Sequence, residues 1–250
     1  MRRGIVAIMF LLLVPPLTVE AQLISSPHNA RSSAMGGCLV RELDTRHIDI
    51  SYRQGFFLAG MADKRLSLVW PMGNMGVATA QYLHHGNLDY HEQQAEVGYA
   101  LNVTTWMLVG VGAQYLNIGT SDPAYRHQQW LVASVYAQAD LNKRTRVVLT
   151  TGSMPWYRQR PVRACLQVQY SPVNGVLTVV AGEMEERLRM RIGMEYSFDG
   201  PFFFRAGLAT APLIGTFGMG FRSGHFSIDI AAEVHQSLGV TPHTTLSLCF

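Results

Sequence analysis

The sequence predicts an all-β protein, a closed antiparallel transmembrane β-barrel of about 14 strands. Three observations support this fold class. Apolar and polar residues alternate along almost the whole chain after residue 22. Only 15% of the residues are charged, while 48% are hydrophobic, and soluble domains usually carry roughly 25% charged residues. The chain also ends, at Phe250, inside an alternating segment rather than in a polar tail. Together these features indicate an apolar surface spread over many strands.

The first residues have the pattern of a cleaved secretory signal. Arg2 and Arg3 precede an apolar run, Pro15 and Pro16 end it, and Ala21 closes an A-x-A-like cleavage site. The run is too short to cross a bilayer as a helix, for which about 20 residues are needed. We therefore expect export to the cell outer membrane. The expected parts of the chain are a signal peptide at 1–21, a periplasmic or lumenal segment at 22–45, and the barrel at 46–250.

Composition and motifs argue against several functional classes. The formal net charge is only +3, so no nucleic-acid partner is expected. Cys38, Cys165 and Cys249 are odd in number and widely spaced, which fits neither a disulfide framework nor a metal site. They are better interpreted as small buried hydrophobic residues. The phosphate-binding, dinucleotide and zinc motifs do not occur, so we expect no cofactor and no metal.

The strand prediction rests on period-two patterns. In "RLRMRIGMEY", Leu188, Met190 and Ile192 face one way, while Arg189 and Arg191 face the other. Several such segments reach about ten residues, the length that a tilted membrane strand requires. The expected strands lie near 46–53, 64–70, 75–84, 88–101, 104–117, 126–139, 143–152, 162–171, 174–182, 186–198, 201–210, 213–222, 225–235 and 241–250.

The connections between these segments alternate in length. Tight turns such as "PMGNM", "LNKRT" and "RSG" alternate with longer stretches such as "QGFFLAGMAD" and "SMPWYRQRP". Short periplasmic turns and longer extracellular loops are the layout of bacterial outer-membrane barrels. With an even number of strands, both ends of the barrel sheet are expected on the periplasmic side.

The last segment is interpreted as the strand that closes the sheet. Leu246, Leu248 and Phe250 would form its outward face, in contact with outer-membrane lipid. The strand must pair with the first one, because unpaired backbone groups in hydrocarbon cost several kcal/mol each. The ending resembles that of bacterial outer-membrane barrels, which implies that Phe250 is recognised by the barrel-insertion machinery.

Charged residues alternate with the apolar ones, so they are expected to line the lumen. We interpret them as a cross-strand charge ladder that fills and rigidifies the barrel. The alternative is an arginine-lined wall that binds an anionic group. Ser227 and His225 share this face, but no nucleophile motif accompanies them, so we expect no enzyme. The expected lumen-facing charged wall consists of Asp49, Arg187, Arg189, Arg191, Glu195, Arg205, Arg222, Asp229 and Glu233.

The stretch "SSPHNARSSAMGGCLV" (Ser25–Val40) resembles the opening of the PorV/PorQ family, FadL-like outer-membrane barrels of Bacteroidetes. "GVATAQYLHHGNLDY" and "HQSLGVTPHTTLSLCF" are similar to hairpins of that family. The resemblance implies an accessory role in type IX protein secretion, with secretion-system proteins or cargo as partners. The motif residues are Ala30, Arg31, Met35, Gly36 and Gly37.

Two alternatives remain open at this point. The first is a FadL-like passive transport barrel for small or hydrophobic solutes. The second is a soluble periplasmic β-sandwich, which would differ from a barrel in having an open sheet.

Overall fold

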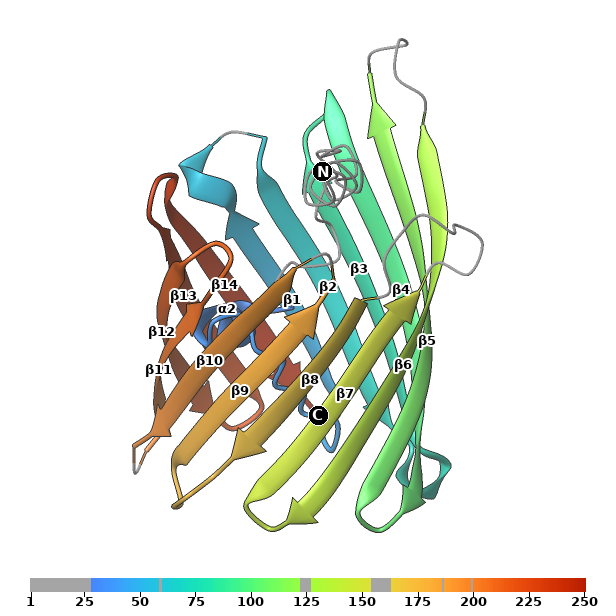
Figure 1. Ribbon diagram of the computed structural model, residues 1–250, viewed down its shortest axis with the longest axis vertical. Coiled ribbons are helices and arrows are strands. Elements are labelled where there is room, and N and C mark those ends of the chain that lie inside the picture. Colours follow the sequence, from blue (N-terminus) through green and yellow to red (C-terminus); the bar gives the residue numbers. More distant parts are fainter. Residues whose placement is uncertain (1–27, 59, 122–126, 154–162, 186, 199) are drawn as a thin grey trace, which may run out of the picture.

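A computed structural model describes residues 28–58, 60–121, 127–153, 163–185, 187–198 and 200–250, and its strands form one closed antiparallel barrel (Figure 1). Each strand pairs with its neighbours in the sequence, and β1 pairs with β14. The strands are β1 (His47–Gln54), β2 (Ala62–Pro71), β3 (Val77–Gly86), β4 (Tyr90–Thr104), β5 (Met107–Thr120), β6 (Gln128–Asn142), β7 (Thr145–Ser153), β8 (Arg163–Tyr170), β9 (Val176–Met184), β10 (Leu188–Ser197), β11 (Phe202–Ala209), β12 (Ile214–Ser223), β13 (Phe226–His235) and β14 (Gly239–Cys249). The predicted fold class of about 14 strands is confirmed.

The seam between the first and last strands is fully paired. Its register runs from His47 opposite Cys249 to Arg53 opposite His243. Phe250 follows β14, but its backbone N–H still donates to the carbonyl of Arg46 at 3.0 Å. The sheet therefore has no free edge, as a sheet in hydrocarbon requires. The alternative of an open β-sandwich is wrong.

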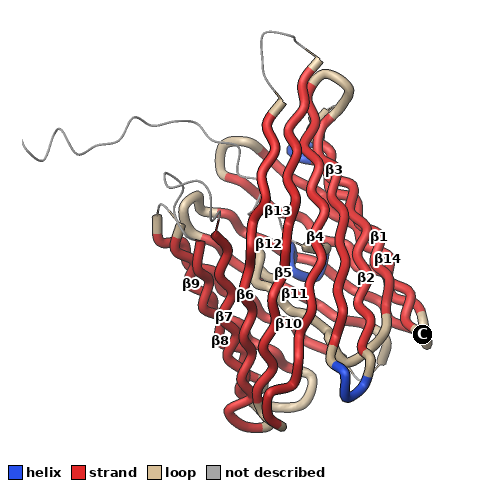
Figure 2. Tube along the Cα trace, turned by 90° about the vertical axis from the view of Figure 1, so that its right-hand side faces the viewer, coloured by secondary structure: helices blue, strands red, loops and turns tan. Residues whose placement is uncertain are grey.

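The two ends of the barrel differ. The connections β2–β3, β4–β5, β6–β7, β8–β9, β10–β11 and β12–β13 lie at one end, here called the turn end, together with the C-terminus (Figure 1). The opposite ends of these strands form the loop end. Two connections there are also short, residues 87–89 between β3 and β4 and residues 236–238 between β13 and β14. β5 and β6 rise furthest at the loop end (Figure 2).

Some strand boundaries differ from the expected ones. β5 was expected at 104–117 but is Met107–Thr120, and β4 and β6 likewise end later than expected. The register of β4 and β5 shifts between Asn102 and Thr104. Alternation continues through this bulge into the turn, so periodicity alone could not place the turn.

The segment before β1 lies inside the barrel. Residues 28–46, here called the plug segment, begin with α2 (Ala30–Ala34), which packs against β11–β14. Figures 1 and 2 show this helix within the sheet cylinder. Asn29 begins the helix in a capping box with Ser32, an arrangement that satisfies exposed N–H groups of the first turn. Ala34 and Met35 are 0% exposed.

Glycines of the plug segment and of the barrel wall permit this close packing. Gly36 has φ +69°, and a Cβ there would lie 2.8 Å from two wall carbonyls. On the wall, a Cβ at Gly207 would lie 2.3 Å from the Gly36 nitrogen, and one at Gly193 would lie 2.5 Å from the Met35 carbonyl oxygen. The plug segment therefore touches the sheet backbone directly.

No helix in the described part of the chain is long and apolar enough to cross a membrane. The expected signal peptide lies outside the described residues.

Candidate functional site

The lumen is the candidate site, and Arg31 of the plug segment is its central charged group. Its guanidinium donates from Nε to Glu195 Oε2 at 2.8 Å and from Nη2 to Glu195 Oε1 at 2.6 Å. It also pairs with Glu42. Burial lowers the pKa of Arg31, but the carboxylates of Glu195 and Glu42 raise it further, so the net shift is upward. Arg31 therefore stays charged in the barrel.

This pair is one step of an alternating series of charges, here called the ion-pair ladder. Arg205 donates to Glu195 at 2.6 Å and also pairs with Asp229. At the other end, Arg222 pairs with Glu42 at 2.9 Å. The ladder crosses from the wall to the plug segment and back. Its members, in order, are Asp229, Arg205, Glu195, Arg31, Glu42 and Arg222.

A second polar contact joins the plug segment to strands β1, β2 and β13. Ser33 Oγ donates to Glu233 at 2.5 Å, and Arg53 donates to the other oxygen of Glu233 at 2.8 Å. Arg53 also pairs with Asp63 at 3.0 Å, and Asp63 accepts from His85. Buried charges are costly unless they are paired. These groups pair with one another, although Arg53 Nε has no hydrogen-bond partner within the described residues.

Wall side chains also hydrogen-bond the backbone of the plug segment. Thr216 Oγ1 accepts from the Gly36 N–H at 2.9 Å and donates to the Ala34 carbonyl at 2.8 Å. Gln167 makes the same two-way contact with the backbone of Leu39, at 2.9 and 2.6 Å. Because side chains rather than strand pairing satisfy these groups, the plug segment is not part of the sheet.

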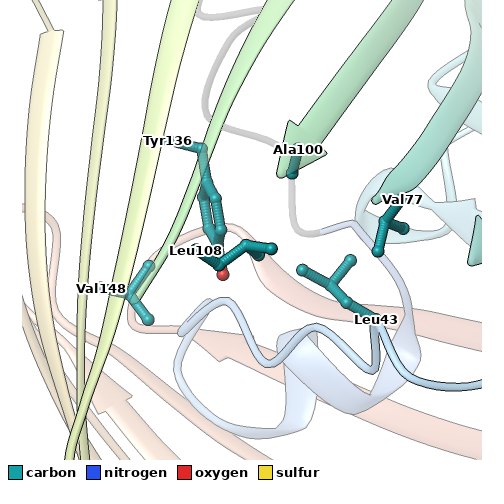
Figure 3. Close-up of a cluster of buried hydrophobic side chains, with 6 residues drawn as sticks. All are labelled: Leu43, Val77, Ala100, Leu108, Tyr136 and Val148. Carbon is teal, nitrogen blue, oxygen red and sulfur yellow. The ribbon is translucent and has the colours of Figure 1, made fainter. Parts of the chain in front are cut away.

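Apolar side chains also pack inside the lumen. Leu43 of the plug segment packs in a cluster of buried side chains (Figure 3). The others in this cluster are Val77, Ala100, Leu108, Tyr136 and Val148. Met35 and Cys38 pack in the same way against Val179 and Ala181, and burial raises the pKa of the Cys38 thiol to about 12. The lumen thus holds apolar clusters as well as charged pairs.

A cavity of about 110 Å³ lies between the plug segment and strands β1–β4 and β12–β14. Two buried atoms on its lining residues lack a hydrogen-bond partner within the described structure, Asp49 Oδ1 and Gln81 Nε2. Ser67, Thr79 and Ser247 add hydroxyl groups to the lining. A cavity of 150 Å³ can hold benzene, so a solute of that size fits here only when the plug segment moves. Such a solute would have to accept one hydrogen bond and donate another.

The residues expected in the charged wall are not equally placed. Arg191, Glu195, Arg205 and Glu233 face the lumen and contact the plug segment or its partners. Asp229 pairs with Arg205, and Asp49 is buried and lines the cavity beside the plug segment. Arg189 donates to the Ala211 carbonyl near the loop end, while the Arg222 side chain is 43% exposed. Arg187 precedes β10 and is exposed, so its place in the charged wall stays a prediction.

The expected motif residues all belong to the plug segment. Ala30, Arg31 and Gly36 donate hydrogen bonds to side chains of the barrel wall. Met35 is fully buried. The carbonyl of Gly37 accepts a hydrogen bond from Arg191 at 2.8 Å.

Sequence reasoning missed Glu42, Arg53 and Asp63 as charged partners. Arg53 and Asp63 could have been found, because both lie on the polar face of strands that flank one loop. Within the described residues, no group of three or more His, Cys, Asp or Glu could hold a metal ion.

No family model and no curated protein matches the sequence. Solved structures do match, over 82–90% of the chain. They include the CymD monoaromatic hydrocarbon channel, at TM-score 0.66 and 10% identity, covering 90% of this chain and 98% of that one. The Ralstonia pickettii toluene transporter TbuX matches at TM-score 0.62 and 12% identity, with 90% and 98% covered. The Acinetobacter baumannii outer membrane protein Omp33 matches at TM-score 0.60 and 9% identity, with 82% and 98% covered.

The chain has the fold of outer-membrane barrels. At these identities the likeness extends to the fold alone, and the resemblance to PorV/PorQ stays a prediction.

Proposed function

We propose that this chain is an outer-membrane barrel that passes small solutes through its lumen, and that the plug segment closes the path. The observation that carries the proposal is that the plug segment fills the lumen through side-chain contacts and takes no part in the sheet. It can therefore move without breaking the barrel.

Transport is favoured over a role in type IX secretion. The similar structures described as a channel and a transporter match this chain over 90% of its length, and none of the similar structures named above is described as a secretion protein. A lumen that is crossed by its own plug segment, with a cavity of about 110 Å³ beside it, also suits a small solute better than a protein cargo.

The lumen favours solutes with an apolar body and a polar end. The apolar cluster around Leu43 offers packing for the body. Asp49 and Gln81 offer an acceptor and a donor for the end, and leaving such groups unpaired is costly. A small hydroxylated aromatic compound fits this description better than a hydrocarbon of the same size does.

The test is solute flux into proteoliposomes that contain the full chain. We expect Arg31→Ala to raise the flux, because it removes the plug segment's hold on Glu195, and breaking a buried ion pair costs about 3–5 kcal/mol. Phenol should enter faster than toluene through both proteins.

Arg46→Ala is the matched control, because Arg46 stacks on Trp70 and lies outside the ion-pair ladder. Both variants should still shift between boiled and unboiled samples on a detergent gel, which reports a folded barrel. A folded Arg31→Ala protein with unchanged flux would remove the plug segment as the gate.

A further inference from the structure

The outward face of the barrel is almost free of charge. Within the described strands, Lys64 on β2 is the one Asp, Glu, Lys or Arg side chain at an outward-facing position. Its neighbours Asp63 and Arg65 are buried toward the lumen. A lone charge on an otherwise apolar surface suggests a specific partner.

Lys64 lies in a row of polar outward side chains. Sheet register places Tyr52 on one side of Lys64 and His84 on the other, with Gln93 beyond His84. His91 stacks on His84, with ring centroids 6.2 Å apart and planes at 14°.

These side chains border a depression of about 640 Å³ on strands β1–β4, here called the outer groove. Its lining also includes Gln54 and Asn87 from the loop end. It thus collects one ammonium group, two imidazoles and several amides at one place.

The outer groove lies where the apolar band ends. The next row toward the turn end holds Ile50, Leu66 and Tyr82, followed across the sheet by Ala95 and Tyr115. Tyrosines mark the level of the lipid head groups in membrane barrels. With the loop end outside the cell, the outer groove faces the head groups of the outer leaflet.

The charge around the outer groove suits an anion. The nearby strand carboxylates, Asp63 and Glu92, point into the lumen. Asp89 lies in the exposed β3–β4 loop and does not line the depression. A lysine ammonium group is a common phosphate partner, and imidazole and amide N–H groups donate to phosphate oxygens.

We propose that the outer groove binds the phosphate of an anionic outer-leaflet lipid. Lys64 supplies the charge, and His84, His91 and Gln93 supply N–H donors. The acyl chains continue along Ile50 and Leu66 on the same face. The proposal rests on the outer-membrane placement in the proposed function but not on transport.

The test is native mass spectrometry of the full chain in detergent with three probes. The probes are bisphosphorylated lipid A, the same lipid after dephosphorylation, and inorganic phosphate as a competitor. We expect retention of the phosphorylated lipid only, and about tenfold weaker retention for Lys64→Gln. The double variant His84→Gln and His91→Gln should weaken it as well.

Gln129→Ala is the matched control, since Gln129 lies in the same polar row on β6, beyond Asn117. Equal retention of dephosphorylated lipid, or unchanged retention by Lys64→Gln, would overturn the proposal. Complete displacement by inorganic phosphate at the lipid's own concentration would reassign the groove to free phosphate. Solute flux is measured separately, so a failed transport proposal leaves this result interpretable.

Discussion

Glu42 shows how one residue of the ion-pair ladder depends on its partners. Burial raises the pKa of its carboxyl, but Arg31 and Arg222 offset this and lower the pKa below its usual 4.5. A carboxyl whose pKa falls on folding stabilises the folded state above its unfolded pKa. That stabilisation is lost as pH falls through the lowered value.

We therefore predict that docking of the plug segment is constant from neutral pH down to about 4.5 and weakens below it. The measurement is hydrogen exchange of residues 30–43 as a function of pH. Glu42→Gln should exchange faster at neutral pH and lose part of this pH dependence, because Glu195 also holds Arg31. Release of the plug segment near pH 6 in the unaltered chain would contradict the assignment to Glu42.

At the scale of elements, the close packing of the plug segment depends on a part of the wall on β10 and β11 that lacks side chains. Gly193 and Gly207 leave room for the backbone of Met35 and Gly36. The contact is between backbones, so no side chain can move aside to make space. Packing of this kind is sensitive to single methyl groups.

We predict that Gly207→Ala displaces the plug segment while the barrel stays closed. The added methyl group would lie 2.3 Å from the Gly36 nitrogen, and such overpacking costs about 1–3 kcal/mol. Hydrogen exchange in residues 30–40 should therefore speed up by roughly tenfold or more. Gly215→Ala is the control, because a Cβ there meets nothing within 4 Å. Similar exchange in both variants would argue against backbone packing as the constraint.

The strands could be predicted from the sequence because alternate residues of a strand face outward and inward. The outward positions favour apolar side chains, and the lumen favours polar ones. Leu188 and Met190 on one face of β10, and Arg189 and Arg191 on the other, are visible without coordinates. The plug contacts were not visible, because Arg31 and Glu195 lie 164 residues apart and no local pattern pairs them. The unpaired atoms of Asp49 and Gln81 depend on how the plug segment packs, so they too required the structure.

For the whole molecule, stability depends on the outward band that meets lipid. Ile192 lies near the middle of β10, between Val180 and Leu208 on the neighbouring strands. A charge there would have to leave water for hydrocarbon, and the cost depends on depth.

We predict that Ile192→Arg destabilises the barrel by about 2–4 kcal/mol, whereas Gln129→Arg near the loop end costs at most about 1 kcal/mol. Chemical unfolding in lipid vesicles measures both values. Equal costs at the two positions would mean that Ile192 does not face the membrane interior.

The position of α2 has a consequence for how the cylinder assembles. The helix packs on β11–β14, the last strands to be synthesised, yet it is joined covalently to β1, the first. If this contact forms before the seam does, it brings the first and last strands of the sheet near each other. This contact shortens the chain length that must be looped to start the seam. A variant that weakens the contact of α2 with β11–β14 should therefore insert more slowly, with a smaller effect on the stability of the finished barrel.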